Sequence, residues 1–128
     1  MEHKAMLDAL VQVKRMGNLL SEVQDLSRQL AEAIDRDDRV SVELLVGMRR
    51  EPIDKLVAAE DVLADQASSL PAEDGARLLA LLGGAPPAGE DERTLAELAA
   101  SNRRRLEQVL ALDKSLNRKL ARENSVYQ

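Results

Sequence analysis

The chain has 128 residues and a formal net charge of −5, with one histidine and no cysteine. The absence of cysteine excludes disulfides, thiolate catalysis and sulfur-ligated metals. Tyr127 is the only aromatic residue, whereas helix formers are abundant. Strands depend on aromatic and β-branched residues, so this composition predicts an all-α fold. Without large aromatics, burial must come from narrow seams between long helices, which favours an elongated, coiled-coil-like bundle.

The length of the chain predicts a single domain over residues 1–128. No apolar run approaches the roughly 20 residues that span a bilayer. The N-terminal sequence MEHKAMLDAL also lacks the layout of a signal peptide. We therefore expect a cytoplasmic protein without a membrane span.

The first predicted helix covers about residues 2–36. Gly17 lies inside it, but the apolar periodicity continues on both sides, so the helix should run through this position. The stripe is wider than a strict coiled-coil seam, which indicates packing against more than one neighbour. It consists of three heptad series: Met6, Val13 and Leu20; Met16, Val23 and Leu30; and Leu19, Leu26 and Ala33.

The charged segment 34–39 should end this helix, and Asp37 or Asp38 can cap the next one. Such a short connection predicts an antiparallel helical hairpin. The second helix is expected over about 39–68. Pro52 lies inside it and should cause a kink near Arg49 to Glu51, or a complete break with Pro52 opening a new helix. We favour the kink, because the apolar stripe continues in phase. The predicted buried face comprises Val42, Leu45, Val46, Ile53, Leu56, Val57 and Leu63.

A short third helix is predicted over 71–82, since Pro71 suits a helix start and Gly83 and Gly84 end it. Residues 83–90 form a Gly/Pro-rich linker, and the last helix should cover about 91–122. Asn102 and Asp113 fall in its apolar seam. They either fix register or oligomeric state, or lie on a shallow, partly hydrated face. The prediction is thus an elongated antiparallel hairpin or bundle of three to four helices.

The sequence offers no catalytic site. A di-metal carboxylate bundle needs two Glu-x-x-His pairs, but His3 is the only histidine. Nucleophilic catalysis lacks a base, and the Gly83–Gly84 pair lacks the lysine and strand of a phosphate-binding loop. We expect no enzyme, no metal and no cofactor.

Charge is distributed unevenly along the chain. Residues 101–128 carry 7 basic and 3 acidic side chains, a net of +4, whereas residues 1–100 have a net of −9. An acidic protein without stacking aromatics is a poor nucleic-acid binder, so we expect none. The basic last helix either packs against the acidic remainder of the bundle or presents a basic rim to an acidic partner.

Long amphipathic helices and an apolar last helix after a linker indicate helix-in-groove recognition of another protein. The alternative is that every apolar stripe is satisfied inside the bundle. Leu and Met surfaces re-pack readily around partners, and the linker would let the last helix detach or swap, so we favour a binding protein.

Two long stretches resemble the FlgN family of flagellar type III export chaperones, in its short Gram-positive form. The first, residues 26–56 (LSRQLAEAIDRDDRVSVELLVGMRREPIDKL), is similar to the family's helix, acidic turn and second helix with a basic pair. The second, residues 102–128 (NRRRLEQVLALDKSLNRKLARENSVYQ), is similar to its C-terminal helix. A Gly/Pro-containing connection after a short third helix adds to the likeness, which spans nearly the whole chain. Pro52 departs from the pattern.

The resemblance implies a cytoplasmic chaperone that binds the C-terminal helical segment of hook-associated filament proteins before export. In that family the C-terminal helix binds the cargo. The matching apolar residues would be Leu106, Val109, Leu110, Leu116 and Leu120. Basic neighbours would tune the encounter rate: Arg103, Arg105, Lys114 and Arg118. The competing hypothesis is a homo-oligomeric coiled-coil scaffold or adaptor, in which Asn102 and Asp113 set the register between copies.

Overall fold

The computed structural model describes residues 1–126 and contains four helices and no strand over that range. The helices are α1 (His3–Asp35), α2 (Arg39–Ser69), α3 (Ala72–Leu82) and α4 (Glu90–Val126). The all-α prediction is confirmed, and three of the expected helices end within a residue or two of the predicted positions. α4 is four residues longer at its C-terminal end than predicted.

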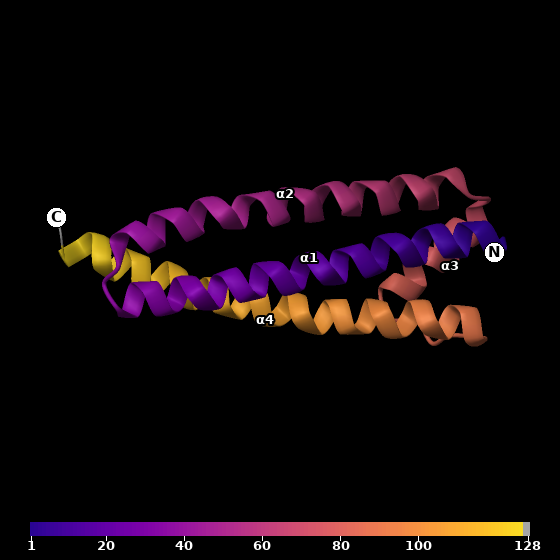
Figure 1. Cartoon of the computed structure of the whole chain (residues 1–128). Helices are drawn as coiled ribbons and strands as arrows, with labels where there is room; N and C mark the ends of the chain where they lie inside the picture. The colour runs from indigo at the N-terminus through magenta and orange to yellow at the C-terminus, as the bar shows by residue number, and fades with distance from the viewer. Residues whose placement is uncertain (127–128) are drawn as a thin grey trace.

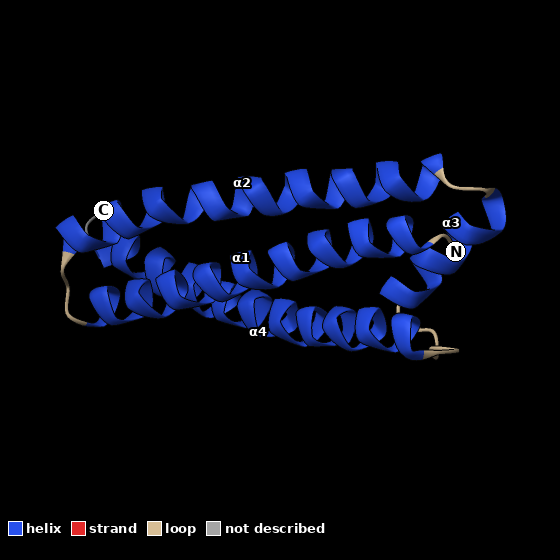
Figure 2. Ribbon diagram, turned by 45° about the vertical axis from the view of Figure 1, so that its right-hand side comes forward, coloured by secondary structure: helices blue, strands red, loops and turns tan. Residues whose placement is uncertain are grey.

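The three long helices lie side by side in an elongated arrangement with α1 in the middle (Figures 1 and 2). α1 packs against both α2 and α4, whereas no Cα atom of α2 lies within 8 Å of one in α4 over the described residues. α3 crosses one end of the bundle and carries the chain from α2 to α4 (Figure 1). As a result, α2 runs antiparallel to α1 and α4 runs parallel to it. The wide apolar stripe of α1 therefore serves two neighbours, as its sequence predicted.

A tight turn joins α1 and α2. Asp37 adopts a positive φ of 57°, and Asp38 caps α2 by accepting from the backbone amide of Ser41 at 3.2 Å and from its hydroxyl at 2.7 Å. These bonds hold the pKa of the Asp38 carboxyl below its ordinary value, since they stabilise the ionised form. The predicted acidic cap is confirmed in Asp38.

α2 continues through Pro52 without interruption, so the alternative of a complete break is wrong. Figures 1 and 2 show α2 without a sharp bend along its length, so the favoured kink is not seen either. The Pro52 ring is buried on the side of α2 that packs against the rest of the bundle. A proline removes one helical hydrogen bond, whereas burial of its apolar ring contributes stabilisation in the opposite direction.

The core divides into two clusters along α1. The cluster near the N-terminus joins all four helices and includes Met6, Val13, Leu63, Leu78 and Leu95. The cluster near the α1–α2 turn joins only the three long helices and includes Leu30, Ile34, Leu45 and Leu116. Between the two clusters, Ile53 and Val57 on α2 and Leu106 and Leu110 on α4 are exposed.

Candidate partner-binding groove

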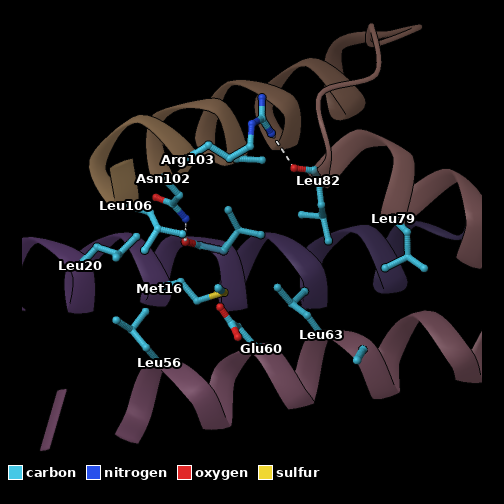
Figure 3. A pocket seen from close by; sticks show the side chains of 13 residues that line it. Met16, Leu20, Leu56, Glu60, Leu63, Leu79, Leu82, Asn102, Arg103 and Leu106 are labelled. Carbon is cyan, nitrogen blue, oxygen red and sulfur yellow. Dashed lines mark hydrogen bonds between the residues drawn. The ribbon is translucent and has the colours of Figure 1, made fainter. Parts of the chain in front are cut away.

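An apolar groove of about 330 Å³ runs along α1 where α2 and α4 stand apart (Figure 3). Its floor is α1, its two walls are α2 and α4, and α3 closes one end. Several lining side chains remain exposed, so the groove opens to solvent. The lining consists of Val13, Met16, Leu20, Leu56, Glu60, Leu63, Ala64, Leu79, Leu82, Ala99, Asn102, Arg103 and Leu106.

Exposed apolar residues extend both walls beyond this lining. On α2, Ile53 lies one turn before Leu56, and Val57 directly follows Leu56. Ile53 and Val57 are exposed. On α4, Leu110 lies one turn after Leu106, on the same face of the helix. From Ile53 to Ala64 the α2 wall covers eleven residue steps, about 16 Å at the helical rise of 1.5 Å. The open apolar surface is therefore about three helical turns long.

An ion pair joins α2 and α4 beyond the end of the groove that lies away from α3. Arg49 precedes Ile53 by one turn of α2 and donates to the Asp113 carboxylate, which follows Leu110 on α4. The Arg49 side chain is only 15% exposed, and its Nε has no hydrogen-bond partner among the described residues. This pair directly links two helices that otherwise stand apart.

Polar groups are few in the groove, and two of the three are already hydrogen-bonded. Asn102 donates from Nδ2 to the main-chain oxygen of Val13 at 2.8 Å, and Arg103 donates to the main-chain oxygen of Leu82. Figure 3 shows both bonds on the α4 side. Glu60 extends from α2 (Figure 3), and no ion pair or hydrogen bond joins its carboxylate to another described residue. Glu60 is exposed, so the groove carries one hydrated carboxylate without a protein partner beside its apolar surface.

The residues predicted to bind a partner do not form one surface. Val109 and Leu116 are 5% and 2% exposed because they pack on α1, and Leu120 is half-buried against the second core cluster. Leu106 lines the groove at 40% exposure, and Leu110 continues its wall at 52%. Only this last pair is available to a partner in this conformation.

The predicted basic rim is divided in the same way. Arg103 binds the end of α3, and Arg105 donates to the main-chain oxygen of Gly17 on α1 at 3.3 Å. Lys114 and Arg118 are exposed and have no ion pair with the described part of the chain. Part of the predicted rim therefore anchors the last helix to main-chain oxygens of its own bundle, while Lys114 and Arg118 remain exposed; whether they face an acidic partner stays a prediction.

The predicted linker is shorter than expected, residues 83–89, and is tied to the bundle. Arg77 on α3 donates to the Pro86 main-chain oxygen at 2.8 Å and pairs with Glu92 at 2.7 Å, and Glu92 accepts from the Ala88 amide at 2.9 Å. The Arg77 guanidinium holds the pKa of the Glu92 carboxyl below its ordinary value, with help from the Ala88 amide. These bonds fix α4 against its own chain.

Sequence reasoning missed the α2 wall of the groove. Ile53 and Val57 were predicted to be buried, but they are 37% and 53% exposed. Leu45 and Leu63 of the same predicted face are buried, while Val42, Val46 and Leu56 are half-buried. The available signal was the width of the α2 stripe, which exceeds what one neighbouring helix can cover.

Among the described residues, no three His, Asp or Glu side chains come together as a metal site requires. None of the described helices has an apolar stretch long enough to cross a membrane. Comparison of the chain with protein-family models, with curated proteins and with solved structures finds no match.

Proposed function

We propose that this protein is a non-catalytic binding protein that holds a helical segment of another protein in the groove between α2 and α4. The observation that carries the proposal is the open apolar surface itself. Leu106 and Leu110 on α4 and Ile53 and Val57 on α2 are exposed on the two helices that form its walls, where a fourth helix would complete a bundle.

The chemistry of the groove favours a helical occupant. An extended segment would need partners for its backbone N–H and C=O groups. The walls are helices whose own backbone groups are already paired, and the side chains of Asn102 and Arg103 are engaged. A helix satisfies its backbone internally and needs only apolar contact, which these walls supply.

The resemblance to flagellar export chaperones supports a narrower form of the proposal. The cargo would be the C-terminal helical segment of a hook-associated filament protein, held in the cytoplasm before export. α4, the helix that this resemblance associates with cargo, supplies one wall of the groove through Leu106 and Leu110.

Binding of such a segment to paired variants tests the proposal. We expect Leu106→Ser with Leu110→Ser to weaken binding at least tenfold in isothermal titration calorimetry, while helicity by circular dichroism is unchanged. The matched control is Leu7→Ser with Leu44→Ser, two leucines that are 46% and 62% exposed but lie outside the groove. Equal binding by both double variants would show that the groove is not the binding site.

The second candidate function is self-association as a scaffold, and the same exposed apolar walls favour it. Light scattering over a range of concentrations separates the two. A concentration-independent dimer that the Leu106→Ser and Leu110→Ser pair converts to a monomer would favour the scaffold, whereas a monomer that binds cargo would favour the chaperone.

A further inference from the structure

The two helix segments that form the walls of the groove carry opposite net charge, counted over all their faces. Residues 50–65 of α2 have five acidic and two basic side chains, a net of −3, whereas residues 103–118 of α4 have five basic and two acidic side chains, a net of +3. The two segments face each other across the same apolar floor. A partner helix in the groove would therefore lie between an acidic wall and a basic wall.

The charges that line the groove, or that lie one turn from the exposed apolar residues of its walls, follow this division. Glu60 lines the α2 wall, and Asp54 and Asp61 lie one turn either side of Val57. On the α4 wall, Arg103 lines the groove and Lys114 follows Leu110 by one turn. Apart from Arg103, whose guanidinium donates to Leu82, none of these groups forms an ion pair or side-chain hydrogen bond with the described residues.

Each wall also carries one charge of the other sign near the groove, Arg50 on α2 and Glu107 on α4. These two charges reduce the difference between the walls without removing it. The apolar strip between the walls is about three helical turns long. A partner that fits this strip would be an amphipathic helix of about that length, with charges on both edges of its apolar face.

On these grounds we propose that the groove takes an amphipathic helix of about three turns whose apolar stripe has basic residues along one edge and acidic residues along the other. The basic edge lies against α2 and the acidic edge against α4. Turning such a helix end for end exchanges its edges, so the charges also select one direction of binding. This inference rests on the proposed function and adds the chemistry of its partner.

Three synthetic peptides test the inference. All have the same apolar stripe, and their edges are Lys and Glu, Lys on both sides, or Glu on both sides. We expect fluorescence anisotropy at about 0.15 M salt to show the mixed peptide binding about tenfold more tightly than either of the others. This preference should shrink at 0.5 M salt, because surface ion pairs are screened.

A variant of the protein should change the preference. Asp54→Lys with Glu60→Lys and Asp61→Lys makes both walls basic, so we expect the peptide with Glu on both edges to bind most tightly. The charge-matched control is Asp8→Lys with Glu22→Lys and Glu43→Lys, three exposed acids outside the groove. This control should keep the wild-type order.

The possible failures are distinguishable. Equal binding of all three peptides would overturn the charge inference and leave helix binding intact. If the wild-type protein binds none of the three peptides and also fails to bind the cargo segment, both proposals are overturned. A stable dimer whose groove is closed to every peptide would identify a second copy as the occupant and would overturn the inference.

Discussion

The side-chain amide of Asn102 on α4 donates to the main-chain oxygen of Val13 on α1 at 2.8 Å. The contact is possible because Gly17, one turn further along α1, has no side chain. A Cβ at Gly17 would lie 2.8 Å from Asn102 Oδ1, which is closer than real Cβ atoms approach. A glycine inside a helix and a polar residue inside an apolar seam are each unfavourable alone. Here they form one contact, which fixes the axial position of α4 along α1.

Substitutions at this contact should be coupled. Gly17→Ala would ordinarily stabilise a helix by about 1 kcal/mol, but here Asn102 must move and lose its bond. We expect Gly17→Ala to give no gain in the wild type and to gain about 1 kcal/mol in an Asn102→Ala background. Urea unfolding of the four proteins measures the coupling. Additive effects would show that the two residues do not constrain each other.

The two halves of the α4 stripe should differ in their effect on stability. Leu116 is buried, so Leu116→Ala should cost about 2–5 kcal/mol of unfolding free energy. Leu110 is exposed, so Leu110→Ala should change it by no more than about 0.5 kcal/mol. Denaturant unfolding followed by circular dichroism measures both. Similar costs for the two variants would contradict the orientation of α4 described above.

A second glycine, Gly75, fixes the corner between α2 and α3. A Cβ there would lie 2.3 Å from the Ala67 carbonyl oxygen, a backbone atom that cannot move aside. Gly75→Ala should therefore lower the stability by about 1–3 kcal/mol. Gly47 is the control, because a Cβ there meets nothing within 4 Å; Gly47→Ala should raise the stability by up to about 1 kcal/mol.

The Arg49–Asp113 pair should contribute to the spacing of α2 and α4. Asp113→Asn leaves a mostly buried guanidinium without its counter-charge, and we expect a loss of about 1–3 kcal/mol. Exchanging the two residues, Arg49→Asp with Asp113→Arg, should recover part of this loss. A single variant as stable as the wild type in thermal unfolding would show that the pair is not formed in solution.

Acid should weaken the connection between α3 and α4. The pKa of Glu92 is held below its ordinary value of 4.5 by Arg77. The stabilisation is therefore fully present above about pH 4.5 and is lost as the pH falls toward the lower, folded-state pKa. We expect Glu92→Gln to unfold at a lower temperature than the wild type at pH 7, with the difference vanishing in acid.

An exposed glutamate in the same helix provides the control for this pH dependence. Glu97→Gln changes the same functional group at an exposed position outside the Arg77 contact. Its midpoint should follow that of the wild type at every pH. A difference for Glu92→Gln that persists or grows below pH 4 would mean that the ion pair is not its source.

The sequence by itself determined the helices, most of their ends and the central place of α1. Helix ends follow from local chemistry, such as the Asp38 cap and Gly84, whose φ of +112° suits only glycine. The double stripe of α1 required two neighbours, because one helix cannot cover so wide an apolar face. These properties depend on residues close together in the chain, so the sequence contains them.

Tertiary structure alone decided which apolar residues remain exposed to solvent. On α4, Leu95, Asn102, Val109 and Leu116 form one heptad series and meet α1, while Leu106 and Leu110 lie on neighbouring series and face the groove. The neighbouring series also contain leucines, and the buried series itself contains Asn102, so periodicity alone does not say which leucines find a partner. That choice follows from the rotation of α4 about its axis, and contacts such as Asn102 with Val13 and Arg49 with Asp113, between residues 89 and 64 positions apart, hold that rotation in place.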